Sequence, residues 1–184
     1  MRTFSKFLAF LAFSIVLFPG PVQAGDRFDF GDIEPEIYGA ISPNLLSTNG
    51  LETGYGGGAG FLYVPYFFDT TRVGIRGHFT YLNYSTYGSQ ETGFSLAPLT
   101  FGIQYGLTHF EDDKHNFLYI FADGGITVAG QNGSQPLWDA GLGFQWDLMF
   151  IEIPFMMIFN GYPHLAPTGP STLNDVQILI GFDL

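Results

Sequence analysis

Bulky apolar residues alternate with small or polar residues along most of the chain after residue 35. In the segment 72–85, for example, Val73 and Ile75 have one parity and Arg76 has the other. A period of two is what a β-strand shows when its two faces meet different surroundings. The pattern predicts eight strands, over 35–47, 54–67, 72–85, 94–110, 117–129, 137–146, 149–162 and 174–184.

The connections between these strands alternate between two kinds. Three are short and polar: 69–71, 111–115 and the turn at Asp147. The other four are longer and rich in Gly, Ser, Asn and Pro: 48–53, 86–92, 131–136 and 163–173. Short periplasmic turns and longer outer loops are typical of bacterial outer-membrane barrels. The order of connections therefore predicts an up-and-down barrel with two unlike ends.

Period two alone also fits a soluble barrel of the lipocalin kind, whose apolar face looks inward. A water-facing surface is normally dense in Lys and Glu, but residues 25–184 contain one lysine, and the polar parity is mostly glycine and other small residues. An Arg on the lipid face at mid-membrane costs about 2–4 kcal/mol. The predicted fold class is therefore all-β, an eight-stranded antiparallel up-and-down transmembrane β-barrel. Aromatic residues near the strand ends, including Tyr84, Trp146 and Phe150, are predicted to form interfacial girdles.

The amino terminus is expected to be a secretory signal peptide. Arg2 and Lys6 precede an apolar run over 7–18, and Val22-Gln23-Ala24 is a small-residue cleavage site. The run is too short to span a bilayer as a helix. We expect 1–24 to be removed on export, 25–34 to be a short periplasmic segment, and 35–184 to form a barrel in the outer membrane of a Gram-negative bacterium.

The exported part of the chain is strongly acidic. The whole sequence has 6 Lys and Arg against 17 Asp and Glu, and only Arg27, Arg72, Arg76 and Lys114 of the basic residues follow position 24. This balance argues against nucleic acid as a partner. The chain has no cysteine, so no disulfide or lipid-modified cysteine is available. We expect no cofactor, and we expect a monomer surrounded by outer-membrane lipids.

Seven polar residues of the inward parity form a candidate lumen network. The third and seventh strands lie opposite each other in an eight-stranded barrel, so Arg72 or Arg76 could reach Glu152 across the lumen. The other four candidates would extend a hydrogen-bonded plug: His78, Gln104, Asp123 and Asp139. Two interpretations stay open: paired charges that fill a narrow interior, and a gated polar path or ion-binding site.

Motifs for catalysis and ligand binding are weak. The segment 54–59 formally matches a dinucleotide fingerprint, but a strand follows it where a helix is needed. Because small outer-membrane barrels include lipid A deacylases, a rim-located lipid-modifying hydrolase using His164, with Ser171 and Asp175 nearby, is the alternative function. The His-x-Ser-Asn pattern of that family is absent after His164, so we predict no enzyme and no catalytic residue. We also predict no metal site, because the surroundings of His115 and His164 offer too few ligands.

The segment 96–128 resembles the middle of the outer-membrane protein W family. A proline-containing start, Ala97-Pro98-Leu99-Thr100, leads to the pair Gln104-Tyr105, a short turn and the glycine-rich strand 121–126. The resemblance implies the eight-stranded fold of that family. Its proposed passage of small hydrophobic molecules is not carried over, because the lumen predicted here is charged. The function classes left open are a structural or adhesive barrel, a narrow porin-like pore or transporter for small solutes, and the rim enzyme.

The alternation continues to the last residue. Its apolar parity is Val176, Ile178, Ile180, Phe182 and Leu184. This resembles the insertion signal that outer-membrane barrels present to the barrel assembly machinery, with Leu in place of the usual terminal Phe. We therefore expect that machinery to be a partner of the last strand.

Overall fold

The structure is a computed structural model, and it describes residues 32–43, 51–65, 73–86, 94–109, 116–130, 134–159 and 172–184. All regular structure in these ranges is β-strand, and no helix in them is long and apolar enough to cross a membrane. The strands are β1 (Asp32–Ser42), β2 (Leu51–Val64), β3 (Val73–Thr86), β4 (Phe94–His109), β5 (Phe117–Gly130), β6 (Pro136–Trp146), β7 (Met149–Phe159), β8 (Thr172–Val176) and β9 (Ile178–Asp183).

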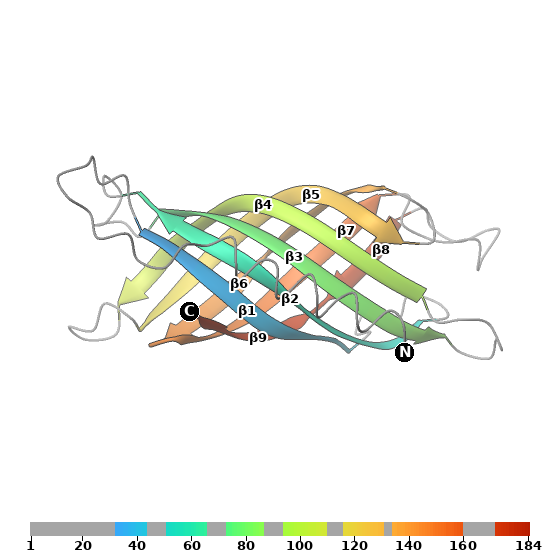
Figure 1. Cartoon of the computed structure of the whole chain (residues 1–184), viewed down its shortest axis with the longest axis horizontal. Helices are drawn as coiled ribbons and strands as arrows, with labels where there is room; N and C mark the ends of the chain where they lie inside the picture. Colours follow the sequence, from blue (N-terminus) through green and yellow to red (C-terminus); the bar gives the residue numbers. More distant parts are fainter. Residues whose placement is uncertain are drawn as a thin grey trace.

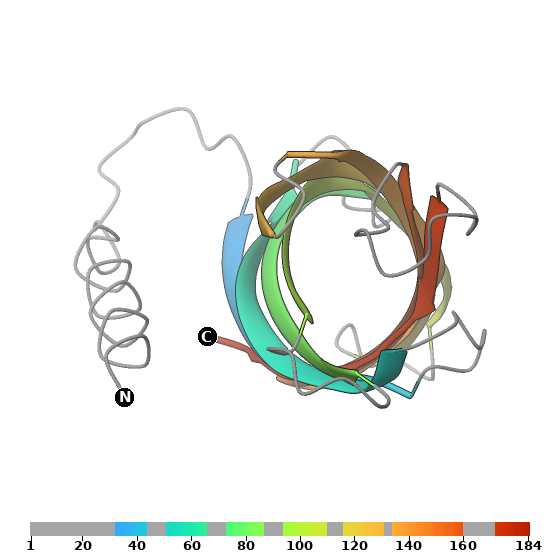
Figure 2. The same ribbon diagram turned by 90° about the vertical axis from the view of Figure 1, so that its right-hand side faces the viewer.

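The strands form one closed antiparallel barrel. Each strand from β1 to β7 pairs with the next along the chain, and β9 pairs with both β7 and β1. The strands run obliquely along the molecule in Figure 1 and form a complete ring when seen from one end in Figure 2. Closure leaves no unpaired sheet edge. The fold is the eight-stranded up-and-down β-barrel that the sequence predicts.

The eighth barrel strand consists of the two short strands β8 and β9. Both have the same register against β7, which places Pro154 opposite Gln177. The Gln177 N–H donates to the Pro154 carbonyl at 3.0 Å, but proline has no N–H to complete the pair. The eighth strand is therefore interrupted at Gln177 by one missing hydrogen bond, and it starts at Thr172 rather than at 174.

Two other strands begin three residues earlier than the sequence pattern predicts, and β6 begins one residue earlier, at Pro136. β1 begins at Asp32 rather than at 35, because residues 32–34 already pair with β2. Residues 32–34 therefore belong to the barrel. β2 begins at Leu51 rather than at 54, because Leu51 pairs with Thr86 before a register shift in β2. Residues 51–53 are strand rather than loop.

One end of the barrel, here called the turn end, carries the tight β6–β7 turn. Asp147 in that turn has a φ of 54°, in the left-handed region that Asp tolerates better than most residues. The start of β1 and the end of β9 lie at the same end. The Asp183 N–H donates to the Leu148 carbonyl, and the Leu184 N–H donates to the Pro35 carbonyl, both at 2.8 Å.

The outward face of the strands is apolar. The charged side chains that the structure describes in the strands occupy the alternate positions that face the lumen. The exception is Glu52, which lies beside the register shift of β2. Large apolar side chains are exposed on every barrel strand, among them Ile37, Tyr55, Ile75, Phe101, Ile103, Ile120, Leu142, Ile153 and Ile180. The alternation predicted for the segment 72–85 is confirmed at the described positions.

The interior of the barrel is filled with side chains. The larger apolar cluster consists of Tyr38, Ala40, Leu82, Tyr84, Leu96, Leu137, Phe150, Met156, Ile158, Leu173 and Leu179. A smaller one consists of Phe117, Tyr119 and Phe121. The girdle prediction is therefore wrong for Tyr84 and Phe150, whose parity directs them inward, whereas Trp146 is exposed as predicted.

Candidate functional site

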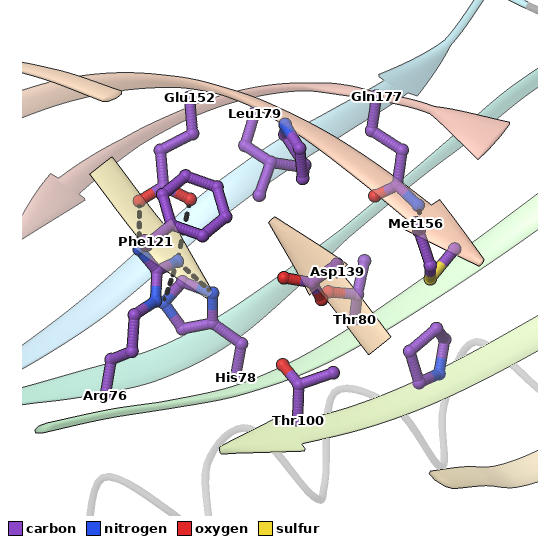
Figure 3. Close-up of a pocket in the computed structure, with 12 residues that line it drawn as sticks. Arg76, His78, Thr80, Thr100, Phe121, Asp139, Glu152, Met156, Gln177 and Leu179 are labelled. Atoms are coloured by element: carbon purple, nitrogen blue, oxygen red, sulfur yellow. Dashed lines mark hydrogen bonds and ion pairs between the residues drawn. The ribbon is translucent and has the colours of Figure 1, made fainter. Parts of the chain in front are cut away.

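A buried ion pair joins opposite walls of the barrel. Arg76 of β3 donates from Nη1 to Glu152 Oε1 at 2.7 Å and from Nη2 to Glu152 Oε2 at 2.8 Å. Both residues are 2% exposed, and Figure 3 shows the two groups meeting inside the lumen. A bidentate guanidinium–carboxylate contact fixes both the direction and the distance of the pair. The predicted contact between the third and seventh strands is the one present here.

Two further contacts hold the Arg76 guanidinium, and a third holds its partner Glu152. Its Nε lies 3.2 Å from Asp123 Oδ2 on β5. Its Cζ lies 4.1 Å from the centre of the Phe121 ring, so the cation packs on an aromatic face. Tyr119 on the same strand donates its hydroxyl to Glu152 Oε1 at 2.8 Å. β5 therefore supports both halves of the ion pair.

His78 extends these contacts to the wall formed by β1. Arginine can only donate, so His78 Nδ1 accepts from Arg76 Nη2 at 2.8 Å and the ring proton is on Nε2. That Nε2 donates to Glu36 Oε2 at 2.6 Å. Side chains from four strands thus form one connected cluster, here called the Arg76 network: Glu36, Arg76, His78, Tyr119, Phe121, Asp123 and Glu152.

The inward face of β2 makes room for bulky side chains from its neighbours. It carries glycine at four successive inward positions, 54, 56, 58 and 60. A Cβ at Gly60 would lie 2.2 Å from His78 Cδ2, and a Cβ at Gly58 would lie 2.6 Å from the Tyr38 hydroxyl. The glycine run that formally matches a dinucleotide fingerprint therefore serves packing in the lumen.

A second polar cluster surrounds Asp175, farther from the turn end. The Asp175 carboxylate accepts hydrogen bonds from the Ser42 hydroxyl, from the Tyr84 hydroxyl at 2.6 Å and from Gln177 Nε2 at 3.0 Å.

Asp175 was also part of the hydrolase alternative. The other two residues of that alternative, His164 and Ser171, lie outside the described residues. The predicted absence of catalysis stays a prediction. At the turn end, Gln145 Nε2 donates to Asp183 Oδ2.

The predicted lumen residues divide into three groups. Arg76, His78, Asp123 and Glu152 are brought together in the Arg76 network. Asp139 is buried on the inward face opposite Asp123 and makes a side-chain hydrogen bond with it, which joins Asp139 to that network. Gln104 is buried on the inward face, but no hydrogen bond described in the structure joins it to that network. Arg72 lies outside the described residues.

The sequence reasoning missed Glu36, Tyr119 and Phe121. All three have inward parity in predicted strands, so the alternation alone contained the signal. Within the described ranges, no three His, Asp or Glu side chains gather in a way that could hold a metal ion.

Fold and lumen together define the structural class of small transmembrane β-barrels. The sequence matches no family model, and no curated protein matches it. The chain is similar in structure to a de novo designed transmembrane β-barrel, at 14% identity and a TM-score of 0.50, over 82% of this chain and 95% of that one. It is also similar to Ail, the attachment invasion locus protein of Yersinia pestis. The structure of Ail in a phospholipid bilayer nanodisc matches at 14% identity and a TM-score of 0.48, over 84% of this chain and 99% of that one. A crystal structure of Ail matches at 15% identity and a TM-score of 0.45, over 83% of this chain and 97% of that one.

At these identities the likeness concerns the fold alone. The resemblance of 96–128 to the outer-membrane protein W family stays a prediction.

Proposed function

We propose that this chain is an integral outer-membrane protein whose barrel is closed inside by its own side chains and serves as a structural element of the envelope. The observation that carries the proposal is the Arg76–Glu152 pair, because it connects opposite walls at the level of the Arg76 network. Removing either partner would leave an uncompensated buried charge.

The outward face supports the membrane location. Phe101, Ile103 and Leu142 are each more than half exposed, on strands whose described outward side chains are uncharged. In water these side chains would form an apolar surface far larger than monomeric soluble proteins tolerate. In lipid the same surface is favourable, and closure of the sheet satisfies the backbone polar groups without water.

The filled interior favours a structural barrel over a pore. The two apolar clusters and the Arg76 network occupy the lumen from several strands at once. An open aqueous channel needs a wider barrel, whereas eight strands leave an interior that side chains fill. Export by the signal peptide, insertion through the barrel assembly machinery and a monomeric state belong to the same proposal.

Planar-bilayer recording tests the closed lumen. We expect the purified wild-type barrel to show no steady conductance, because the Arg76 network and the two apolar clusters occupy the lumen. Arg76→Ala should admit small, irregular current steps by removing the group that joins the walls. Gln104→Ala, on the same inward face but outside the network, should stay silent like the wild type. Regular current steps from the wild type would contradict the proposal.

A further inference from the structure

Two aspartates face each other inside the lumen, on the neighbouring strands β5 and β6. Asp123 and Asp139 are direct partners in the register of these strands. Both are buried, and their side chains make a hydrogen bond with each other. An ionised carboxyl group can only accept hydrogen bonds. The contact between the two side chains therefore requires a proton on one of them.

The charges around this pair leave one carboxyl group without a counter-charge. Arg76 is the one arginine among the described residues, and they contain no lysine. Its guanidinium makes ion pairs with Glu152 and with Asp123, and His78 is neutral in its contact with Arg76. With Asp139 included, three carboxyl groups share one fixed cation. The titratable groups of the Arg76 network that surround the pair are Glu36 of β1, Arg76 and His78 of β3, Tyr119 of β5 and Glu152 of β7.

The surroundings of the two carboxyl groups indicate which one holds the proton. Asp123 Oδ2 lies 3.2 Å from Arg76 Nε, so a cation balances its ionised form. No ion pair of the described residues reaches Asp139. Asp139 lies with Thr100 on the wall of a small cavity (Figure 3), to which β4 and the eighth strand present only uncharged side chains. Because a buried carboxylate without a counter-charge takes up a proton instead, Asp139 is the donor and Asp123 the acceptor.

We propose that the lumen is a proton-binding site, in which Asp139 holds one proton at neutral pH and donates it to Asp123, and that the barrel loses stability when rising pH removes this proton. In the unfolded chain both aspartates are ionised above about pH 5. The folded state then binds one more proton than the unfolded state, so its stability falls as pH rises. Once the proton is lost, two like charges lie directly opposite each other and repel. The site concerns the lumen itself, so it does not depend on which role the barrel has in the envelope.

Infrared spectroscopy of the purified barrel tests for the proton directly. The barrel is measured at about pH 8 in a neutral detergent without carbonyl groups, where ordinary Asp and Glu side chains are ionised. We expect a carboxylic acid C=O band, recognised by its shift in heavy water. Asp139→Asn should abolish this band. Asp183→Asn is the matched control, because it removes a lumen carboxyl group at the turn end that accepts from Gln145, and it should keep the band.

Urea unfolding of the same samples tests the effect of pH on stability. The range from about pH 7.5 to about 9 lies between the usual pKa values of His and Tyr, so neither residue type titrates in the unfolded chain. The folding equilibrium constant of the wild type should fall by up to about tenfold per pH unit, the change for one proton. Asp139→Asn should remove this fall, because its amide group can donate to Asp123 at every pH. Asp183→Asn should keep it.

Three outcomes would overturn the proposal: no carboxylic acid band in the wild type, a band that Asp139→Asn leaves unchanged, or a wild-type stability that does not fall over this pH range. If Asp139→Asn does not fold, Asp123→Asn replaces it. Its amide group donates to Asp139, which then keeps its charge, so the band should again be lost. Because neither measurement uses conductance or the location of the chain, their failure would leave the proposed function untouched.

Discussion

At the scale of single residues, the described part of the lumen depends on one fixed cation, Arg76. Arg76 is in direct contact with Glu152, Asp123 and His78. Buried ion pairs add little net stability compared with apolar residues of the same shape, but removing one partner is costly. The sequence has few basic residues with which to replace this contact. The Arg76 side chain should therefore be among the positions least tolerant of substitution.

Arg76→Met should lower the free energy of unfolding by about 3–5 kcal/mol, because Glu152 and Asp123 would lose their counter-charge. The double variant Arg76→Met, Glu152→Met should lose less than the sum of the two single variants, since each single change removes the same pair. Urea unfolding in detergent, followed by tryptophan fluorescence, measures all three. Gln104→Met, a buried control outside the network, should change stability by about 1 kcal/mol or less. Additive losses would show that the two residues are not coupled.

Glycines give a second prediction at this scale. Gly60→Ala should lower the free energy of unfolding by about 1–3 kcal/mol, because the new Cβ would meet the His78 ring and the Gly77 carbonyl. Gly39→Ala is the matched control, since a Cβ there has nothing within 4 Å. Both variants can be compared by thermal unfolding in the same detergent. Equal effects at the two positions would contradict the packing argument.

The side to which a residue points was predictable wherever its position in the alternation alone decides between the lumen and the outer face. Arg76 and Glu152 were assigned to facing strands correctly because an eight-stranded barrel fixes which strands oppose each other. Phe150 and Tyr84 were misassigned because residue type was weighed above parity.

At the scale of elements, the C-terminal strand closes the barrel. β9 pairs with β1 through Ile37 and Phe182, among other pairs. Backbone hydrogen bonds from Asp183 and Leu184 then fasten its end to the β6–β7 turn and to β1. The pairing of the last strand with β7 on one side and with β1 on the other therefore depends on its final residues.

Deleting residues 182–184 should block assembly of the barrel, because the deletion removes these closing hydrogen bonds and the end of the apolar alternation. The measurement is the fraction of the expressed protein that is found in the outer membrane in a folded, heat-modifiable form. Leu184→Phe, which restores the usual terminal residue, should assemble at least as well as the wild type. Normal insertion of the shortened chain would contradict the prediction.

Strand existence was predictable from the sequence, whereas several strand limits were not. The period of two identified all eight barrel strands. The interruption at Gln177 depends on a proline in the neighbouring strand, and the early start of β2 depends on a register shift. Both are pairing effects that the sequence of one strand does not contain.

At the scale of the whole molecule, the chain is organised with apolar side chains outside, and with its charged side chains and two apolar clusters inside. The outward parity has large apolar side chains on every barrel strand, and the inward parity has the described ion pairs and the β2 glycines. The overall architecture was predictable because this one pattern repeats in all strands. The details of the lumen were less predictable, since they depend on contacts between strands far apart in the sequence.

The most direct test of this account is the location and gel migration of the exported chain in a Gram-negative host. We predict that the processed chain is recovered in the outer-membrane fraction, that detergent is needed to extract it, and that unheated samples migrate differently from boiled ones. Recovery of the processed chain as a freely dissolved periplasmic monomer without detergent would contradict it.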